Sequence, residues 1–303
     1  MRKLWTTATL LCACGGGGES DEAKIHTASW GLQAIPRTPA LNAVWPVSDT
    51  EVWVVGDGGT ILRFDGETWA LAASPTEQDL LAIWGSGIQT VIAVGARGTL
   101  ISRQGSEWVE VASGTAATLR TVCGTGPQDL WAFGDAGAGV HGDGQTWSVV
   151  TDAAGLEVRG AWMSSEGIGL AVGTAGEHAA ALSFTAGRWA MANGGLAGLV
   201  ELADVWREPD GDPLAVGRDA HGGIGLRWTG TVWAAHEGAV PDRATAVLGK
   251  LVGSRAGLVD AESSPAITLV EGEVRDVRGA GGERFAVGAL DGHGAIWRAP
   301  SPE

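Results

Sequence analysis

A repeat of about 39 residues runs along the chain, and it constrains the fold more than any other feature. Each copy contains a short apolar segment that closes on glycine. This glycine occurs seven times, at Gly56, Gly95, Gly134, Gly173, Gly217, Gly253 and Gly288. The first four are spaced by 39 residues, and the later intervals are 44, 36 and 35 residues. A regular array of this period indicates seven similar units that pack against one another.

Each unit divides into four short segments with strand character. In the first copy they are Leu41–Trp45, Val52–Val55, Thr60–Phe64 and Thr68–Ala72. The second segment is apolar on both faces, which is typical of a sheet covered on both sides. Four strands in a unit of this length predict an all-β fold, a seven-bladed β-propeller with four antiparallel strands per blade.

The turn between the third and fourth segments carries Asp-Gly, as in Asp65-Gly66 and Asp143-Gly144. Glycine supplies the positive backbone angle that a tight hairpin turn requires, and aspartate bonds to the backbone that follows it. These turns support the division of each unit into hairpin-connected strands.

Tryptophans in the fourth segment indicate how the ring closes. They occur in five copies, at Trp69, Trp108, Trp147, Trp189 and Trp233. The seventh copy ends at Trp297 and Arg298 after only three segments. Trp30 precedes Trp45 by 15 residues, the spacing that separates Trp69 from the Trp of the next unit. We therefore expect an N-terminal strand near Trp30 to close the ring and cover its open edge.

The first residues have the pattern of an export signal. Arg2 and Lys3 precede an apolar stretch, Leu4–Leu11, which is too short for a permanent membrane span. The segment Leu11-Cys12-Ala13-Cys14 resembles a bacterial lipobox, in which the final cysteine is lipidated. The alternatives are signal cleavage without lipidation and a mis-chosen start codon, since the segment is short and Cys12 is unusual at its place.

This reading divides the chain into three parts. Residues 1–13 are predicted to be a signal peptide, 14–24 a lipid-anchored, glycine-rich tether, and 25–303 the propeller. The protein is then exported and anchored in a bacterial envelope, facing the periplasm or the cell surface. Its contact with the membrane would be through the lipid on Cys14 alone.

Charge and cysteine content limit the partners and the covalent links. The chain has 35 acidic and 20 basic residues, a net charge of -15, so nucleic acid is not an expected partner. After processing, Cys14 and Cys123 are the cysteines that remain, and no structural disulfide is expected. We expect the protein to be a monomer without a cofactor.

The repeat resembles two known groups of propellers. The segment AIWGSGIQTVIAVGARGTLISRQGSEW, 82–108, is similar to repeats of bacterial and plastid photosystem II assembly-factor-like propellers. Asp65-Gly66-Glu67-Thr68-Trp69 resembles the latter part of the Asp-box of the sialidase superfamily. The resemblance covers nearly all of 28–299 and extends to the WD40/YVTN-like repeats. It implies a scaffold and transfers no activity, because fold does not specify function.

The catalytic residues that known enzyme classes require are largely missing from the sequence. Sialidases of this superfamily use a tyrosine nucleophile, and the chain contains no tyrosine. A Gly-x-Ser-x-Gly elbow is also absent from the sequence. A carbohydrate-active enzyme, a glycosidase or lyase with carboxylates paired across blades, stays open as the alternative. No catalytic residue is assigned.

Extra residues lie on one face of the predicted ring. From the closing glycine to the outer tryptophan there are 13 residues in the first three copies and 16 in the fourth and fifth. These extra residues, and three in the seventh copy, fall between the second and third strands. In a propeller, all loops at this position emerge on the same face of the ring. The candidate ligand-binding residues on them are Glu177, His178, Arg218, Asp219, His221, Asp291 and His293.

Two interpretations of these histidines are possible. They could form a three-histidine metal site, or they could be polar residues of exposed turns, and we assign no metal. As a whole, the sequence predicts a non-enzymatic binding or scaffold module that presents one loop-rich face to a protein or glycan partner.

Overall fold

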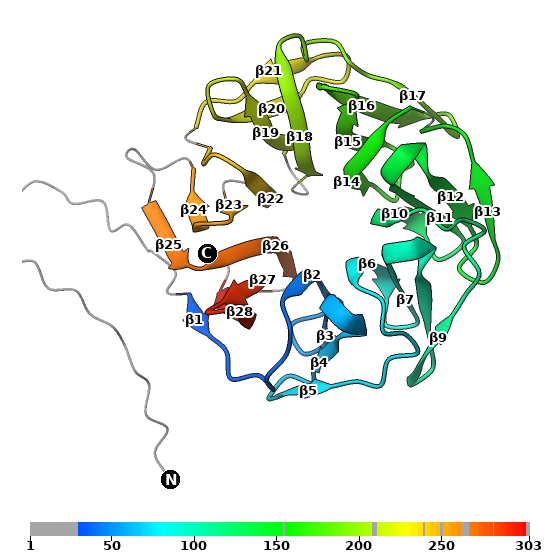
Figure 1. Ribbon diagram of the computed structural model, residues 1–303, viewed down its shortest axis with the longest axis vertical. Coiled ribbons are helices and arrows are strands. Elements are labelled where there is room, and N and C mark those ends of the chain that lie inside the picture. Colours follow the sequence, from blue (N-terminus) through cyan, green and yellow to red (C-terminus); the bar gives the residue numbers. More distant parts are fainter. Residues whose placement is uncertain are drawn as a thin grey trace, which may run out of the picture.

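Seven four-stranded antiparallel sheets surround a central axis in the computed structural model (Figure 1). The structure describes residues 30–300 except 154, 208–210, 239, 249–250, 262–266 and 281. The predicted seven-bladed β-propeller is thus confirmed. The predicted signal peptide, Cys14 and the tether lie outside the described residues.

The strands fall into four concentric positions, and blades are numbered here from the one that begins at Leu41. The inner strands are β2 (Leu41–Pro46), β6 (Leu80–Gly87), β10 (Leu119–Gly126), β14 (Glu157–Met163), β18 (Leu199–Trp206), β22 (Ala244–Leu248) and β26 (Glu273–Ala280). The second strands are β3 (Val52–Gly56), β7 (Thr90–Gly95), β11 (Asp129–Gly134), β15 (Gly169–Ala175), β19 (Leu214–Asp219), β23 (Leu251–Ser254) and β27 (Glu283–Leu290). The third strands are β4 (Ile61–Phe64), β8 (Leu100–Gln104), β12 (Gly139–Gly142), β16 (His178–Thr185), β20 (Gly223–Trp228), β24 (Gly257–Asp260) and β28 (His293–Pro300). The outer strands are β5 (Trp69–Leu71), β9 (Glu107–Glu110), β13 (Trp147–Val150), β17 (Arg188–Met191), β21 (Trp233–Ala235), β25 (Ile267–Glu271) and β1 (Gly31–Leu32).

The hydrophobic core lies between neighbouring blades. Every residue of β3 is buried, as expected for a strand covered on both faces. The outer-strand tryptophans join these layers, since Trp69 packs with Phe64 of its own blade and Phe285 of blade seven. Each blade therefore buries its neighbour's apolar surface, and this mutual burial is the main stabilisation of the ring.

The closing glycines are required by a close backbone approach. A Cβ at Gly134, Gly173 or Gly288 would lie 1.9 Å from a carbonyl oxygen at the start of the paired inner strand. The backbone of Gly134 is itself extended, so this contact, and not a positive φ, excludes larger residues. Blade six departs from the predicted pattern, because Ser254 and not Gly253 takes this position in the ladder, opposite Ala244.

The ring closes through the N-terminal segment, as the sequence predicts. Strand β1 pairs antiparallel with β28, with Gly31 opposite Arg298 and Leu32 opposite Trp297 (Figure 1). Trp30 packs against the cluster between blades six and seven. Blade seven is therefore built from both ends of the described chain.

The extra residues of blades four, five and seven lie between the second and third strands, as predicted, but they lengthen the strands instead of forming open loops. In blade four, β15 and β16 pair from Gly169 to a tight turn at Gly176-Glu177. In blades one to three the same connection is a short 3-10 turn, formed by η1 (Asp57–Gly59), η2 (Ala96–Gly98) and η3 (Asp135–Gly137).

Candidate functional site

A β-bulge in every inner strand, next to the residue that pairs with the closing position of the second strand, shapes the central channel. At this place the ladder between the inner and second strands skips one inner-strand residue in each blade, for example between Leu41 and Ala43. A bulge re-aims the extra side chain away from the ladder. The seven bulged residues all line the channel: Asn42, Leu81, Arg120, Arg159, Ala203, Thr245 and Arg275.

The channel mouth on this face is a wide, strongly basic depression of about 510 Å³. Five arginines line it, namely Arg120, Arg159, Arg218, Arg243 and Arg255, against one acidic residue, Glu201. The whole chain is strongly acidic, so this concentration of cations is a local exception. Because salt screens charges beyond about 8 Å at physiological ionic strength, the potential at the mouth is set by these five arginines and by the nearby carboxylates of Glu201, Asp135 and Asp242.

Acidic neighbours fix part of this basic cluster in place. Arg120 forms a two-point ion pair with Asp135, whose hydrogen bonds raise the pKa of Arg120. Arg218 donates from Nε to Glu201 at 2.8 Å, and this bond raises the pKa of Arg218. The Nη2 of Arg159 lies 3.9 Å from the same carboxylate. Glu201 thus orients two arginines while cancelling only one charge.

Two other arginines have no acidic partner within the described part of the chain. Arg243 and Arg255 are exposed cations on blade six, at the rim of the mouth. Arg243 has a left-handed backbone, with φ +57°, which is unfavourable for a residue with a Cβ.

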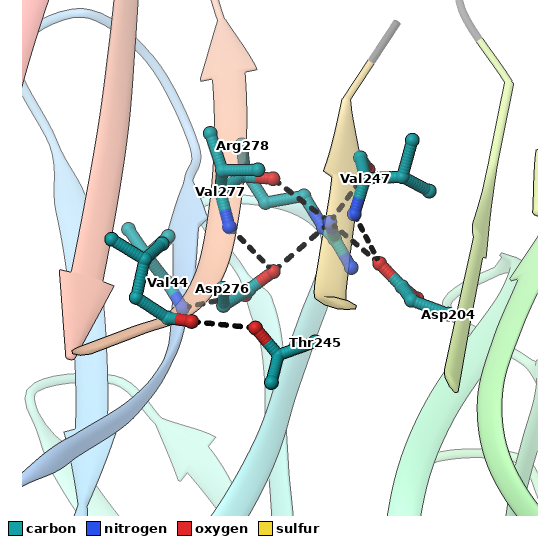
Figure 2. Close-up of polar contacts among 8 residues, drawn as sticks. Val44, Asp204, Thr245, Val247, Asp276, Val277 and Arg278 are labelled. Carbon is teal, nitrogen blue, oxygen red and sulfur yellow. Dashed lines mark hydrogen bonds and ion pairs between the residues drawn. The ribbon is translucent and has the colours of Figure 1, made fainter. Parts of the chain in front are cut away.

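Deeper in the channel, two buried aspartates share one arginine (Figure 2). The Nη1 of Arg278 lies 2.9 Å from Oδ1 of Asp276 and 3.5 Å from Oδ2 of Asp204. The N–H of Val277, in the same strand, donates to Oδ1 of Asp276 at 2.9 Å, and two further contacts of the carboxylates cross blade boundaries. Val247 donates its N–H to Asp204, and Val44 donates its N–H to Asp276, each at 3.0 Å. This triad therefore connects blades five, six, seven and one.

Burial sets the protonation of the triad. Removal from water raises the pKa of Asp276 to about 6, with Arg278 opposing the shift and Asp204 adding to it. Burial also raises the pKa of Asp204, again opposed by Arg278. The carboxylate oxygens accept bonds from neighbouring strands, so in this geometry they serve the junctions between blades.

Tryptophans line the channel beside the triad. Trp45, Trp84, Trp162 and Trp206 occupy one repeat position of the inner strand, and Cys123 takes it in blade three. Cys123 is a free, buried thiol whose pKa is raised by burial. The guanidinium carbon of Arg278 lies 4.5 Å from the ring centroid of Trp206.

The candidate residues predicted from the sequence lie on this face but do not form one site. Arg218 lines the channel mouth. Asp219 and His221 share an exposed turn, in which Asp219 accepts the N–H of His221 at 2.7 Å. Glu177 and His178 are exposed at the turn of the β15–β16 hairpin.

The seventh blade carries the remaining candidates. Asp291 is exposed at the β27–β28 turn, and His293 lies beside it with Nε2 2.7 Å from an Nη2 of Arg37. Among the residues that the structure describes, no group of three or more His, Cys, Asp or Glu side chains is placed to hold a metal ion. In the same residues, no helix is long and apolar enough to cross a membrane.

Part of the basic mouth has a signal in the repeat itself. Arg120 and Arg159 stand 39 residues apart, one repeat, and therefore occupy the same position in neighbouring blades. Arg275 holds that position in blade seven. Arg243 and Arg255 lie in connections of the least regular blade, and no repeat position marks them.

Comparison with known proteins supports the fold. No protein-family model matches the chain, and no curated protein matches it. A solved structure described as "YCF48 bound to D1 peptide" is similar at 15% identity and a TM-score of 0.66, covering 93% of this chain and 100% of that one. YCF48 from Cyanidioschyzon merolae is similar at 13% identity and a TM-score of 0.65, with 90% and 99% covered. The WD40 β-propeller domain of Doa1 has 12% identity and a TM-score of 0.65, with 88% and 96% covered. At these identities the likeness shows the propeller fold alone.

Proposed function

We propose that this protein is a non-enzymatic binding module, anchored by a lipid on Cys14 in a bacterial envelope, that captures an acidic segment of a protein partner at the arginine-lined channel mouth. The observation that carries the proposal is the gathering of five arginines against one glutamate in a chain of net charge -15. Guanidinium groups bind carboxylates through charge-assisted, two-point hydrogen bonds.

The form of the mouth supports a protein ligand. Its volume of about 510 Å³ lies within the range of sites that enclose several ligand groups. One solved propeller of similar fold is described as bound to a peptide. Arg120 and Arg159 are bulged residues of inner strands, and Arg218 is held by Glu201, so this part of the site loses little ordering entropy on binding.

Binding can be tested with two substitutions that have the same chemistry. Arg243→Gly removes a cation of the mouth and relieves its left-handed backbone, so it weakens binding without loss of stability. Arg97→Gly is the matched control, because Arg97 also has a left-handed φ, of +55°, and is exposed in η2 outside the mouth. We expect Arg243→Gly to weaken an acidic peptide about threefold, and Arg159→Gln with Arg243→Gly about tenfold.

The measurement is fluorescence anisotropy of a labelled pentapeptide of four glutamates around alanine, with a lysine peptide as the charge-reversed control. Affinity should fall with rising salt, since the contacts are ionic. Equal binding of the two peptides, or equal effects of Arg243→Gly and Arg97→Gly, would contradict the proposal.

The location is tested separately. Replacing Cys14 by serine should release the protein from sedimented membranes and abolish its labelling by a radioactive fatty acid. Light scattering of the released chain should give the mass of a monomer. A protein that stays membrane-bound and labelled after Cys14→Ser would show that the anchor lies elsewhere.

A further inference from the structure

Below the basic mouth, the channel continues into a narrower chamber of about 130 Å³. The two spaces share six lining residues: Asn42, Leu81, Arg120, Arg159, Ala203 and Thr245. They are therefore one continuous surface, and a ligand held by the arginines can extend a group into the chamber without a long spacer. The chamber has about the size of a cavity that encloses one benzene ring.

The chamber wall is aromatic. Trp45, Trp84 and Trp206 line it and are only half-buried, whereas four of the five outer-strand tryptophans are buried. The ring centroid of Trp45 lies 5.9 Å from that of Trp84 and 6.5 Å from that of Trp206. The three rings thus form a connected apolar surface whose faces are not fully used by the fold.

Two features leave room for a guest beside these rings. Blade three carries Cys123 where four other blades carry tryptophan, and the smaller side chain lines the chamber. Arg278 is fixed over Trp206 by the two aspartates, so the chamber also presents a planar guanidinium. Indole and guanidinium faces both favour contact with an aromatic ring over an aliphatic group of similar size.

We propose that the chamber takes one aromatic side chain of the acidic segment bound at the mouth, so that the partner is recognised through an aromatic residue flanked by carboxylates. This inference depends on the proposed function for the charged part of the ligand. It adds a requirement that the basic mouth alone does not impose. The arginines of the mouth select a segment with acidic residues, and the chamber selects which side chain stands between those acidic residues.

The test compares blocked pentapeptides in which four glutamates surround phenylalanine, leucine or alanine, measured by anisotropy and by quenching of tryptophan fluorescence. The phenylalanine peptide should bind about tenfold more tightly than the alanine peptide, from burial of one aromatic side chain. The leucine peptide should fall between them. A leucine peptide as tight as the phenylalanine peptide, or no difference among the three, would overturn the inference.

Variants separate the chamber from the mouth. Trp84→Ala should remove the preference for phenylalanine and leave the affinity of the alanine peptide unchanged, whereas Trp84→Phe should keep most of the preference. Trp30→Ala is the control for general loss of a half-buried indole, because Trp30 lies on the outside of the ring. If Trp84→Ala and Trp30→Ala affect the preference equally, the chamber is not the site.

The two proposals fail in different ways. If no acidic peptide binds, or the lysine peptide with a central phenylalanine binds as well as its acidic counterpart, the proposed function fails. If the acidic peptides bind alike and respond to Arg243→Gly but not to the central residue, the mouth is the site and the chamber takes no side chain.

Discussion

Ionisation of Asp276 should lower the stability of the folded chain between about pH 4 and pH 6. Burial raises the pKa of this carboxyl group from 3.8 to about 6. Each pKa unit corresponds to about 1.4 kcal/mol, so the ionised group in the folded state costs about 3 kcal/mol relative to the protonated one. The folded chain holds the proton more tightly than the unfolded chain. The stabilisation is therefore fully present below pH 3.8 and is lost as the pH rises through about 6.

The assay is urea unfolding of the natural chain and of Asp276→Asn at pH values from 4 to 7. The asparagine cannot ionise, so the difference in unfolding free energy, natural chain minus variant, isolates this carboxyl group. We expect that difference to fall by about 2 kcal/mol over the interval, because part of the full effect lies below pH 4. Above pH 6 the variant should be at least as stable as the natural chain, because one guanidinium then faces one carboxylate instead of two.

Two further variants make the experiment decisive. Asp204→Asn removes the like charge that contributes to the raised pKa of Asp276, so the remaining pH dependence should be weaker. Asp143 is exposed, and backbone hydrogen bonds from Thr146 and Gln145 lower its pKa. Its contribution is lost only below pH 3.8, so Asp143→Asn should give a flat difference from pH 4 to 7. A difference for Asp276→Asn that is flat or rises with pH would refute the account of the triad.

Three other outcomes follow from the packing. Gly134→Ala should lower the free energy of unfolding by about 3 kcal/mol, because its Cβ would lie 1.9 Å from the Thr118 carbonyl oxygen. Gly126→Ala is the control, because a Cβ there has open space around it, and it should change the thermal midpoint little. Trp30→Ala should lower the free energy of unfolding in urea by about 2 kcal/mol, because it weakens ring closure. Leu32→Ala should be nearly neutral, because that side chain is 56% exposed. Equal effects of the two variants would contradict the role of Trp30 in closure. In a chain with Cys12 and Cys14 replaced by serine, Cys123 should react with a thiol reagent only after unfolding, because it is buried and its pKa is raised. Rapid reaction of the folded chain would contradict the burial of this thiol.

The repeat made most of the fold predictable from the sequence. The spacing of Gly56, Gly95, Gly134 and Gly173 fixed the blade length, and the physical reason is the backbone contact at each of these positions. The position of Trp30 relative to Trp45 predicted the ring closure. The prediction for blade six was wrong by one residue, because Ser254 holds the position that glycine takes in the other blades, and the predicted Gly253 pairs with Ala246.

The site was much harder to predict than the fold. Arg218 was among the candidates, but the histidines of blades four, five and seven lie on separate hairpins. Which turns approach each other depends on the inclination of blades around the axis, and one sequence does not encode that as a pattern. The mouth arginines come from four blades, so they converge only after the ring has closed. Arg120, Arg159 and Arg218 belong to blades three, four and five, and Arg243 and Arg255 both belong to blade six.

The bulges in the inner strands have a consequence for how this scaffold can change over evolution. A residue in the ladder is constrained by its partner strand and by the adjoining blade, but the bulged residue has left the ladder. Substitutions at such places can alter the charge and shape of the opening while the interior of the ring is preserved. Asn42 and Arg275 are linked to each other, and Thr245 donates to the Val274 carbonyl of blade seven, so these three would have to change together with their partners. The other four bulged positions, Leu81, Arg120, Arg159 and Ala203, are where one framework could acquire new ligands most readily.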